Sequence, residues 1–128
     1  MPDSPLHCAV GQVGEFHAVV TEADTAEALG SGDLAVLGTP RILAWLERAS
    51  CLAVAGTVDS DWTTVGAHVN LDHLAPSRVG EAVTCRAELT EVKGRRLTFA
   101  VSAHSDSNSV MIARGTVLRV AIQRSSVD

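Results

Sequence analysis

The chain has 128 residues and a formal net charge of −5 at pH 7, with 46% hydrophobic and 20% charged residues. This length predicts a single domain, residues 1–128, and this composition is typical of a globular chain rather than a disordered one. A net acidic chain binds a phosphate backbone poorly, and the sequence holds two phenylalanines, two tryptophans and no tyrosine for base stacking. We therefore expect no nucleic-acid partner.

The three cysteines, Cys8, Cys51 and Cys85, are widely separated and form no Cys-x-x-Cys pair. This argues against a zinc knuckle or a dithiol redox motif, and the apolar neighbours of Cys51 and Cys85 favour buried, unreactive thiols. The first basic residue is Arg41, and no apolar run approaches the ~20 residues that cross a bilayer. We expect no secretory signal, no membrane partner and a cytoplasmic location.

The first third of the chain predicts a loop, a strand and a lid. Residues 1–11 are rich in helix and strand breakers and predict an N-terminal tail or a loop that leads into the first strand. The run VGEFHAVVT at 13–21 has β-branched residues in partial alternation, which is typical of a strand. Residues 22–38 contain three glycines and predict a loop or a short helical lid.

The segment that follows predicts one long helix. Thr39 can cap a helix, Pro40 is favoured at the first helical position, and Gly56 is a suitable stop after the run RILAWLERASCLAVA. At 100° per residue, Arg41 and Arg48 share one narrow polar stripe, whereas nearly all other positions are apolar or small. We therefore expect this helix to be buried on most sides.

After a polar linker at 57–61, the rest of the chain predicts four strands in meander-like succession, over residues 65–72, 83–90, 97–103 and 110–122. The last of these is apolar on both faces, as expected of a central strand. The alternating apolar positions in the first of these strands are Val65, Ala67, Val69 and Leu71. Those predicted to face the core in the next two strands are Val83, Cys85, Ala87, Leu89, Leu97, Phe99, Val101 and Ala103.

A strand, a lid, one apolar helix and four strands can form one core if a curved antiparallel sheet wraps around the helix. This α+β arrangement, with about five strands, is the hotdog fold. A cystatin-like sheet would also place the helix before the strands, but it leaves that helix a wide solvent-exposed face. The fold also predicts a homodimer, because hotdog sheets commonly join edge to edge and so cover their exposed edges.

Three side chains are candidates for chemistry. Glu47 lies about 110° around the helix from the arginine stripe, where a carboxylate faces the core or an interface, unless it pairs with Arg41 or Arg48. His73 ends the first strand after the helix and could move a proton, although a lone histidine at a strand end is also a common surface residue. Thr39 either caps the helix or presents a hydroxyl at its positively polarised end.

The remaining histidines do not suggest a metal site. His68 and His73 are five positions apart and would lie on opposite faces of a strand. We therefore expect no bound metal.

Several segments together resemble the hotdog-fold acyl-CoA thioesterases of the fluoroacetyl-CoA type, from about residue 13 to residue 122. The motif has a threonine eight positions before a helical glutamate and a histidine 26 positions after it. The segments that carry the resemblance are Gly38-Thr39-Pro40, WLERA around Glu47, VGAHVNLDHLAPSRVGEAVT at 65–84 and EVKGRRLTFAVSAH at 91–104.

The resemblance implies a site for each matching residue. Thr39, Glu47 and His73 match the catalytic positions of the family. Gly66 matches a glycine whose backbone lies against the acyl thioester, and Arg119 matches an arginine near the same pocket. Glu47 would then act as a nucleophile or as the base that activates water, and His73 would align Thr39 or the water.

The resemblance further implies hydrolysis of an acyl-CoA thioester to a free acid and CoA, at a homodimer interface, with no cofactor other than the CoA of the substrate. The lid at 22–38 has no aromatic residue, whereas the fluoroacetyl enzyme is described as having phenylalanines there. Fluoroacetyl specificity is therefore not expected. Two rival functions stay open: a non-catalytic module that sequesters a small acyl ligand, and a hydratase, for which adjacent Asp72 and His73 are poorly placed.

Overall fold

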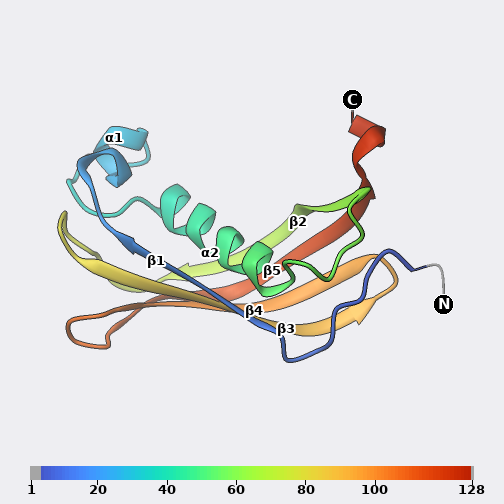
Figure 1. Ribbon diagram of the computed structural model, residues 1–128. Coiled ribbons are helices and arrows are strands. Elements are labelled where there is room, and N and C mark those ends of the chain that lie inside the picture. Colours follow the sequence, from blue (N-terminus) through green and yellow to red (C-terminus); the bar gives the residue numbers. More distant parts are fainter. Residues whose placement is uncertain (1–3, 128) are drawn as a thin grey trace.

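The structure is a computed structural model that describes residues 4–127. Five strands form one sheet, and one long helix lies across it (Figure 1). Along the chain the elements are β1 (Val13–Val19), the 3-10 helix η1 (Glu22–Asp24), α1 (Ala26–Leu29), α2 (Thr39–Ala53), β2 (Trp62–His73), β3 (Ala82–Lys93), β4 (Arg96–Ser105), β5 (Met111–Gln123) and the 3-10 helix η2 (Arg124–Val127). This confirms the predicted architecture of a single helix on an antiparallel sheet.

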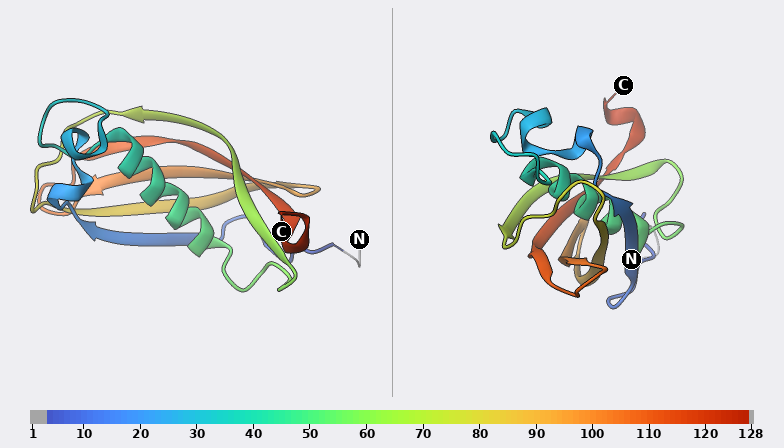
Figure 2. Two further views of the ribbon diagram at one scale, coloured as in Figure 1. Left: turned by 90° about the horizontal axis from the view of Figure 1, so that it is seen from above. Right: turned by 90° about the vertical axis from the view of Figure 1, so that its left-hand side faces the viewer.

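The strand order is β1-β3-β4-β5-β2, and every pair is antiparallel. The prediction of four strands in meander-like succession is wrong for the first of them, because β2 pairs with β5 rather than β3. The edge of β3 that a meander would use is already occupied by β1, with Val13 opposite Glu88. As a result, β2 forms one edge of the sheet and β1 forms the other (Figure 2).

The core lies between α2 and the concave face of the sheet. All eight alternating positions predicted to face inward on β3 and β4 are buried, as expected for period-2 strands with one face packed. Ile42, Trp45, Leu46 and Ala49 of α2 pack against them. The contact between helix and sheet is close enough that a Cβ at Gly14 of β1 would overlap the backbone of α2.

The helix is less covered than predicted. Its buried residues lie on one side, whereas Pro40, Ala44, Arg48 and Leu52 form an exposed row at four-residue spacing. Three members of this row are apolar or small, and Leu52 is 37% exposed. The prediction of burial on most sides is therefore wrong for the single chain, because no part of this sheet reaches that flank of the helix.

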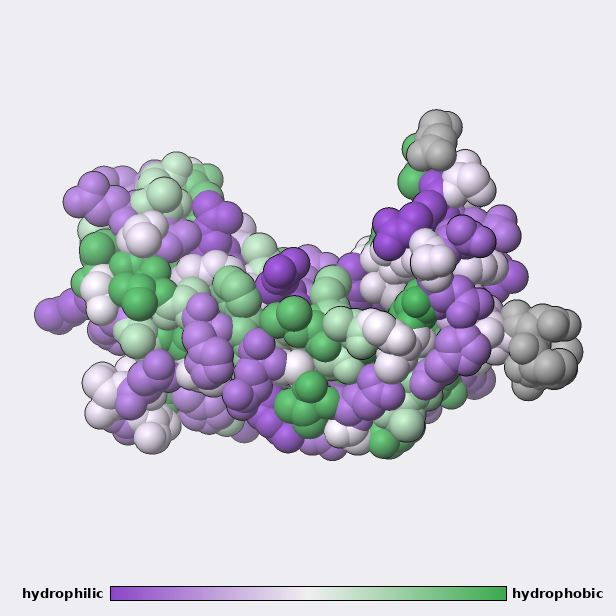
Figure 3. Space-filling view, viewed as in Figure 1, coloured by the Kyte–Doolittle hydropathy of each residue, from purple (hydrophilic) through white to green (hydrophobic). Residues whose placement is uncertain are grey.

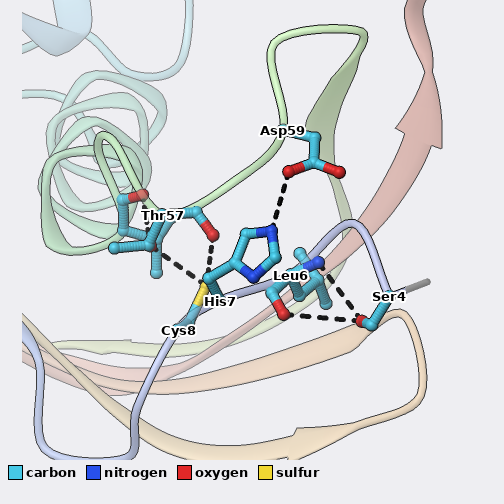
Figure 4. Close-up of polar contacts among 7 residues, drawn as sticks. Ser4, Leu6, His7, Cys8, Thr57 and Asp59 are labelled. Atoms are coloured by element: carbon cyan, nitrogen blue, oxygen red, sulfur yellow. Dashed lines mark hydrogen bonds and ion pairs between the residues drawn. The ribbon is translucent and has the colours of Figure 1, made fainter. Parts of the chain in front are cut away.

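The N-terminal segment is attached to the linker after α2. Leu6 is buried and forms an isolated bridge with Val58, and the His7 ring lies 2.7 Å from an Asp59 oxygen (Figure 4). The backbone nitrogen of His7 also donates to the Thr57 carbonyl. Residues 4–11 thus form an ordered loop leading into β1, whereas residues 1–3 of the predicted tail lie outside the described part of the chain.

Residues 22–37 form the predicted lid over the N-terminal end of α2. They contain η1 and α1. An isolated bridge between Thr25 and Leu37 joins two parts of the lid, and another between Val36 and Arg78 attaches the lid to the segment after β2. An ion pair of 2.9 Å between Arg41 of α2 and Asp24 links the helix to the lid. The lid therefore covers the end of the helix at which Thr39 lies.

Candidate active site

Thr39 and His73 form a hydrogen-bonded pair where the start of α2 meets the end of β2. Gly38 is the N-cap residue and provides no side-chain cap, so Thr39 occupies the first turn itself. Its hydroxyl lies 2.8 Å from Nδ1 of His73 instead of capping the helix. The functional alternative for Thr39 thus fits the geometry better than the capping role.

The His73 ring is partly withdrawn from solvent. Burial lowers its pKa below the usual 6.5, and a backbone hydrogen bond with Ala75 acts in the opposite direction. A ring that is neutral at pH 7 can accept the Thr39 hydroxyl proton at Nδ1.

A cavity of about 280 Å³ opens beside this pair. Its walls come from the lid, from the start of α2 and from the segment that follows β2. The neighbours of Thr39 and His73 in this cavity are mainly aliphatic: Ala26, Val36, Leu37, Leu74 and Pro76. The arrangement can hold a small apolar group against a hydroxyl and an imidazole.

Glu47 belongs to a second polar cluster, two turns further along α2. Its Oε2 accepts a hydrogen bond of 3.0 Å from an Arg119 guanidinium nitrogen. The same guanidinium donates twice to Thr64, from Nε to the hydroxyl at 2.9 Å and from the other terminal nitrogen to the backbone carbonyl at 2.9 Å. The Arg119 side chain is 8% exposed and that of Glu47 33%, so the carboxylate is the part of the cluster that solvent reaches.

Gly66 is packed against this carboxylate. A Cβ at Gly66 would overlap Oε2 of Glu47, so any side chain at this position would displace the carboxylate or the strand. Gly66 lies opposite Arg119 in the β2–β5 register and next to the bulge between Gly66 and His68. The backbone of an exposed edge strand therefore lies directly beside Glu47.

Within one chain the predicted site residues thus form two groups. Thr39 and His73 make one group, and Glu47, Gly66 and Arg119 make the other. Thr39 and Glu47 are eight residues apart on one helix, about 12 Å along its axis. The predicted meeting of all three catalytic groups at one cleft therefore stays a prediction about the assembled protein.

Thr64 is a site residue that the sequence analysis missed. It carries two of the three hydrogen bonds that orient Arg119. Strand alternation places Thr64 on the same face as Gly66, which was a usable signal once the register opposite Arg119 was known. No local motif indicates that register.

The described residues, 4–127, lack two further features. They contain no group of three or more histidine, cysteine, aspartate or glutamate side chains that could hold a metal ion. None of their helices is both long and apolar enough to cross a membrane.

Comparison with known proteins identifies the family. A family model described as fluoroacetyl-CoA-specific thioesterase matches residues 20–125. The fluoroacetyl-CoA thioesterase of Streptantibioticus cattleyicolor is 33% identical over 87 residues, which are 68% of this chain and 61% of that protein. The chain thus spans about three fifths of the length of this curated relative.

Solved structures agree with this assignment. The crystal structure of a mutant fluoroacetyl-CoA-specific thioesterase, in complex with fluoroacetate and CoA, matches with a TM-score of 0.87 and 28% identity, covering 94% of this chain and 100% of that one. A thioesterase superfamily member from Thermus thermophilus matches with a TM-score of 0.84 at 24% identity, covering 93% of this chain and 87% of that one. A hot-dog-like protein from Thermanaerovibrio acidaminovorans matches with a TM-score of 0.82 at 19% identity, covering 92% and 86%.

The last two likenesses concern the fold alone, and they confirm the predicted hotdog fold. The family model extends over the lid, the long helix and all strands except β1. The chain therefore belongs to the fluoroacetyl-CoA-specific thioesterase family.

Proposed function

We propose that this protein hydrolyses an acyl-CoA thioester to a free acid and CoA. Family membership supports the reaction class. The observation that carries the proposal for this chain is the 2.8 Å contact between Thr39 Oγ1 and His73 Nδ1, beside a cavity that lid residues help to line. A carboxylate fixed by Arg119 supplies the remaining reactive group.

The active form in this proposal is a homodimer joined along β2. This strand has twelve residues and pairs on one side alone, and Val65, Gly66, Ala67 and His68 at its middle are exposed. An unpaired edge strand of this length presents backbone N–H and C=O groups that can pair with a further strand. The molecule is hollowed above the exposed flank of α2, between the lid and the C-terminal end (Figure 3). The partner helix can pack in this hollow.

A two-fold axis would also bring the two polar groups together. Because the bulge adds one residue between Gly66 and His68, antiparallel pairing of two β2 strands about an axis at Asn70 sets Gly66 opposite the partner's His73. Glu47, which touches Gly66, would then face the Thr39–His73 pair of the partner subunit. In this arrangement each of two identical sites draws on both chains.

The proposed reaction steps follow from which side-chain atoms are already hydrogen-bonded. Among the described residues Glu47 is held at Oε2, which leaves Oε1 to attack the thioester carbon. The C–S bond breaks and an acyl-glutamyl anhydride forms, and in this arrangement the Gly66 backbone amide and the positive end of the partner subunit's α2 stabilise the oxyanion. Water then attacks the anhydride, and its proton passes through the Thr39 hydroxyl to Nδ1 of His73 and on to the CoA thiolate. The products are the free acid, CoA and a regenerated Glu47 carboxylate.

The acyl group in this proposal is small and aliphatic. The lid residues that line the cavity, Ala26, Ser31, Val36 and Leu37, include no aromatic or charged side chain. A cavity of about 280 Å³ holds a short acyl chain but offers no partner for a second carboxylate. Fluoroacetyl specificity is not carried over from the relatives.

A thiol-release assay over a panel of acyl-CoAs tests the reaction. We expect wild-type protein to release CoA from short aliphatic thioesters, and Glu47→Gln and His73→Ala to lose at least about 100-fold in kcat. Hydroxylamine should trap the acyl group of wild-type protein as a hydroxamate. Binding of acyl-CoA without thiol release by any of the three proteins would identify a sequestering module instead, and hydration of an enoyl-CoA with inert saturated thioesters would identify a hydratase.

Mixing two inactive variants tests the shared site. When Glu47→Gln and His73→Ala chains exchange subunits, a mixed dimer contains one site with both substitutions and one site with neither. We therefore expect activity to return on mixing. If all three groups acted within one chain, each site of the mixed dimer would carry one substitution and the mixture would stay inactive.

A further inference from the structure

The charge of this protein is unfavourable for its proposed substrate, whose nucleotide carries three phosphate groups. The chain has a net charge of −5 and ten lysine and arginine residues. Within residues 4–127, three of the ten are in ion pairs with carboxylates: Arg41, Arg86 and Arg119. A polyanion must therefore be attracted by the other seven.

Four of these seven lie together at the end of the molecule opposite the lid. Lys93 and Arg96 flank the β3–β4 turn that also contains Arg95, and Arg124 begins η2. The backbone joins these segments, because the nitrogen of Ala121 in β5 donates to the Arg95 carbonyl. Figure 2 shows the β3–β4 turn and the C-terminal end at the same end of the sheet. We call Lys93, Arg95, Arg96 and Arg124 the basic end.

The basic end also carries a flat surface. The Arg95 guanidinium lies over the Trp62 ring, 4.6 Å from its centroid. This contact holds a planar cation in place, whereas an unrestrained arginine would lose more entropy on binding a phosphate. A cavity of about 230 Å³ is lined by Trp62, Arg95 and Gln123.

Two cavities lie between this end and the Glu47 cluster. A second cavity of about 240 Å³ lies between the end of α2 and the start of β2, and it is lined by Cys51, Trp62, Thr64 and Arg124. Cys51 is one helical turn beyond Glu47, and Thr64 binds the arginine that holds Glu47. Trp62 lines both cavities, so the two are neighbours along the line from the Glu47 cluster to the basic end.

We propose that the basic end binds the 3′-phosphorylated adenosine diphosphate of CoA, while the pantetheine arm follows the cavity between α2 and β2 to Glu47. This rests on the proposed thioesterase function. It assigns nucleotide binding to the subunit that supplies Glu47. Arg95 and Arg96 bind the phosphates, and Trp62 supports Arg95.

The test compares substrates with and without the nucleotide. Arg95→Gln combined with Arg96→Gln removes two charges and keeps polar side chains of similar length, and Arg114→Gln, at an exposed arginine of β5, is the matched control. For the double variant we expect KM for an acyl-CoA to rise about 10- to 100-fold with kcat unchanged. KM for the same acyl group on pantetheine should not change, and Arg114→Gln should behave as wild type with both substrates.

The outcomes separate this inference from the proposed function. An unchanged KM for acyl-CoA in the double variant, or an equal rise for acyl-pantetheine, would overturn the nucleotide site while leaving the hydrolase intact. If wild-type protein hydrolyses neither substrate, the proposed function fails, and calorimetric titration with CoA and with pantetheine then decides the site. Tighter binding of CoA that the double variant loses supports the basic end, and equal binding by wild type and variant refutes it.

Discussion

The hydroxyl of Thr64 offers a direct test of how Glu47 is positioned. Thr64→Val keeps the shape of the side chain and the backbone carbonyl that accepts from Arg119, but it removes the acceptor of the Arg119 Nε proton. The Arg119 side chain is 8% exposed, so water replaces that acceptor poorly. Leaving a buried charged donor without a partner costs about 1.5–3 kcal/mol.

Because the Thr64 carbonyl still holds the guanidinium, we expect the lower part of this range. If the loss appears in the transition state, kcat should fall about tenfold, since 1.4 kcal/mol corresponds to a factor of ten. KM should stay within about twofold, because valine has the shape of threonine and leaves the cavity between α2 and β2 with the same outline. The melting temperature should fall by about 4 °C for a domain of this size.

Thr64→Ser is the matched control because it retains the hydroxyl. Steady-state kinetics and thermal unfolding of both variants measure the effect, and the serine variant should recover most of the lost kcat. Equal kcat values for wild type, valine and serine variants would refute the reasoning that Thr64 positions Glu47 through Arg119. A loss of stability with no loss of kcat would assign Thr64 a purely structural role.

Three further predictions follow from the site and the core. Gly66→Ala should lower kcat at least about 100-fold with normal folding by circular dichroism, because its Cβ would displace the Glu47 carboxylate by a distance that catalysis does not tolerate; activity near wild type would contradict the packing. The acidic limb of the kcat–pH profile should have its midpoint below pH 6.5, because burial lowers the pKa of His73 and protonation of Nδ1 removes the acceptor of the Thr39 proton. Below pH 6.5 the unfolded chain binds a proton at His73 before the folded chain does, so the free energy of unfolding should fall as the pH drops. The His73→Gln variant should lose this pH dependence. Burial, with a smaller contribution from Asp106, raises the pKa of Cys85 to about 12, so its thiol should resist iodoacetamide at pH 8 until the protein unfolds. Rapid labelling of native Cys85, detected by mass spectrometry, would argue against a buried thiol.

Local sequence patterns were sufficient to identify most of the helices and strands. Alternation identified the buried positions of β3 and β4 because a packed sheet face requires an apolar residue at every second position. The Thr-Pro start and the apolar run identified α2, although Gly38 is the N-cap residue and the hydroxyl of Thr39 binds His73 instead. Element type depends on neighbours along the chain, which the sequence displays directly.

Long-range pairing was not accessible in the same way. Nothing near β2 indicates that β1 already occupies the edge of β3, so the place of β2 beside β5 could not be read from either strand alone. The exposed row on α2 was likewise missed, since an apolar pattern does not distinguish a flank covered by the chain itself from one left for a partner.

By itself, the sequence determined the element types and the inward-facing residues of β3 and β4, and it indicated three candidate catalytic side chains, because each of these depends on residue chemistry and local spacing. Tertiary structure alone decided which of those side chains touch. The antiparallel register of β2 against β5 places Gly66 opposite Arg119, and the position of α2 on the sheet then sets Glu47 beside both. Contacts between residues far apart in the chain arise from the packing of whole elements, and no short segment contains that information.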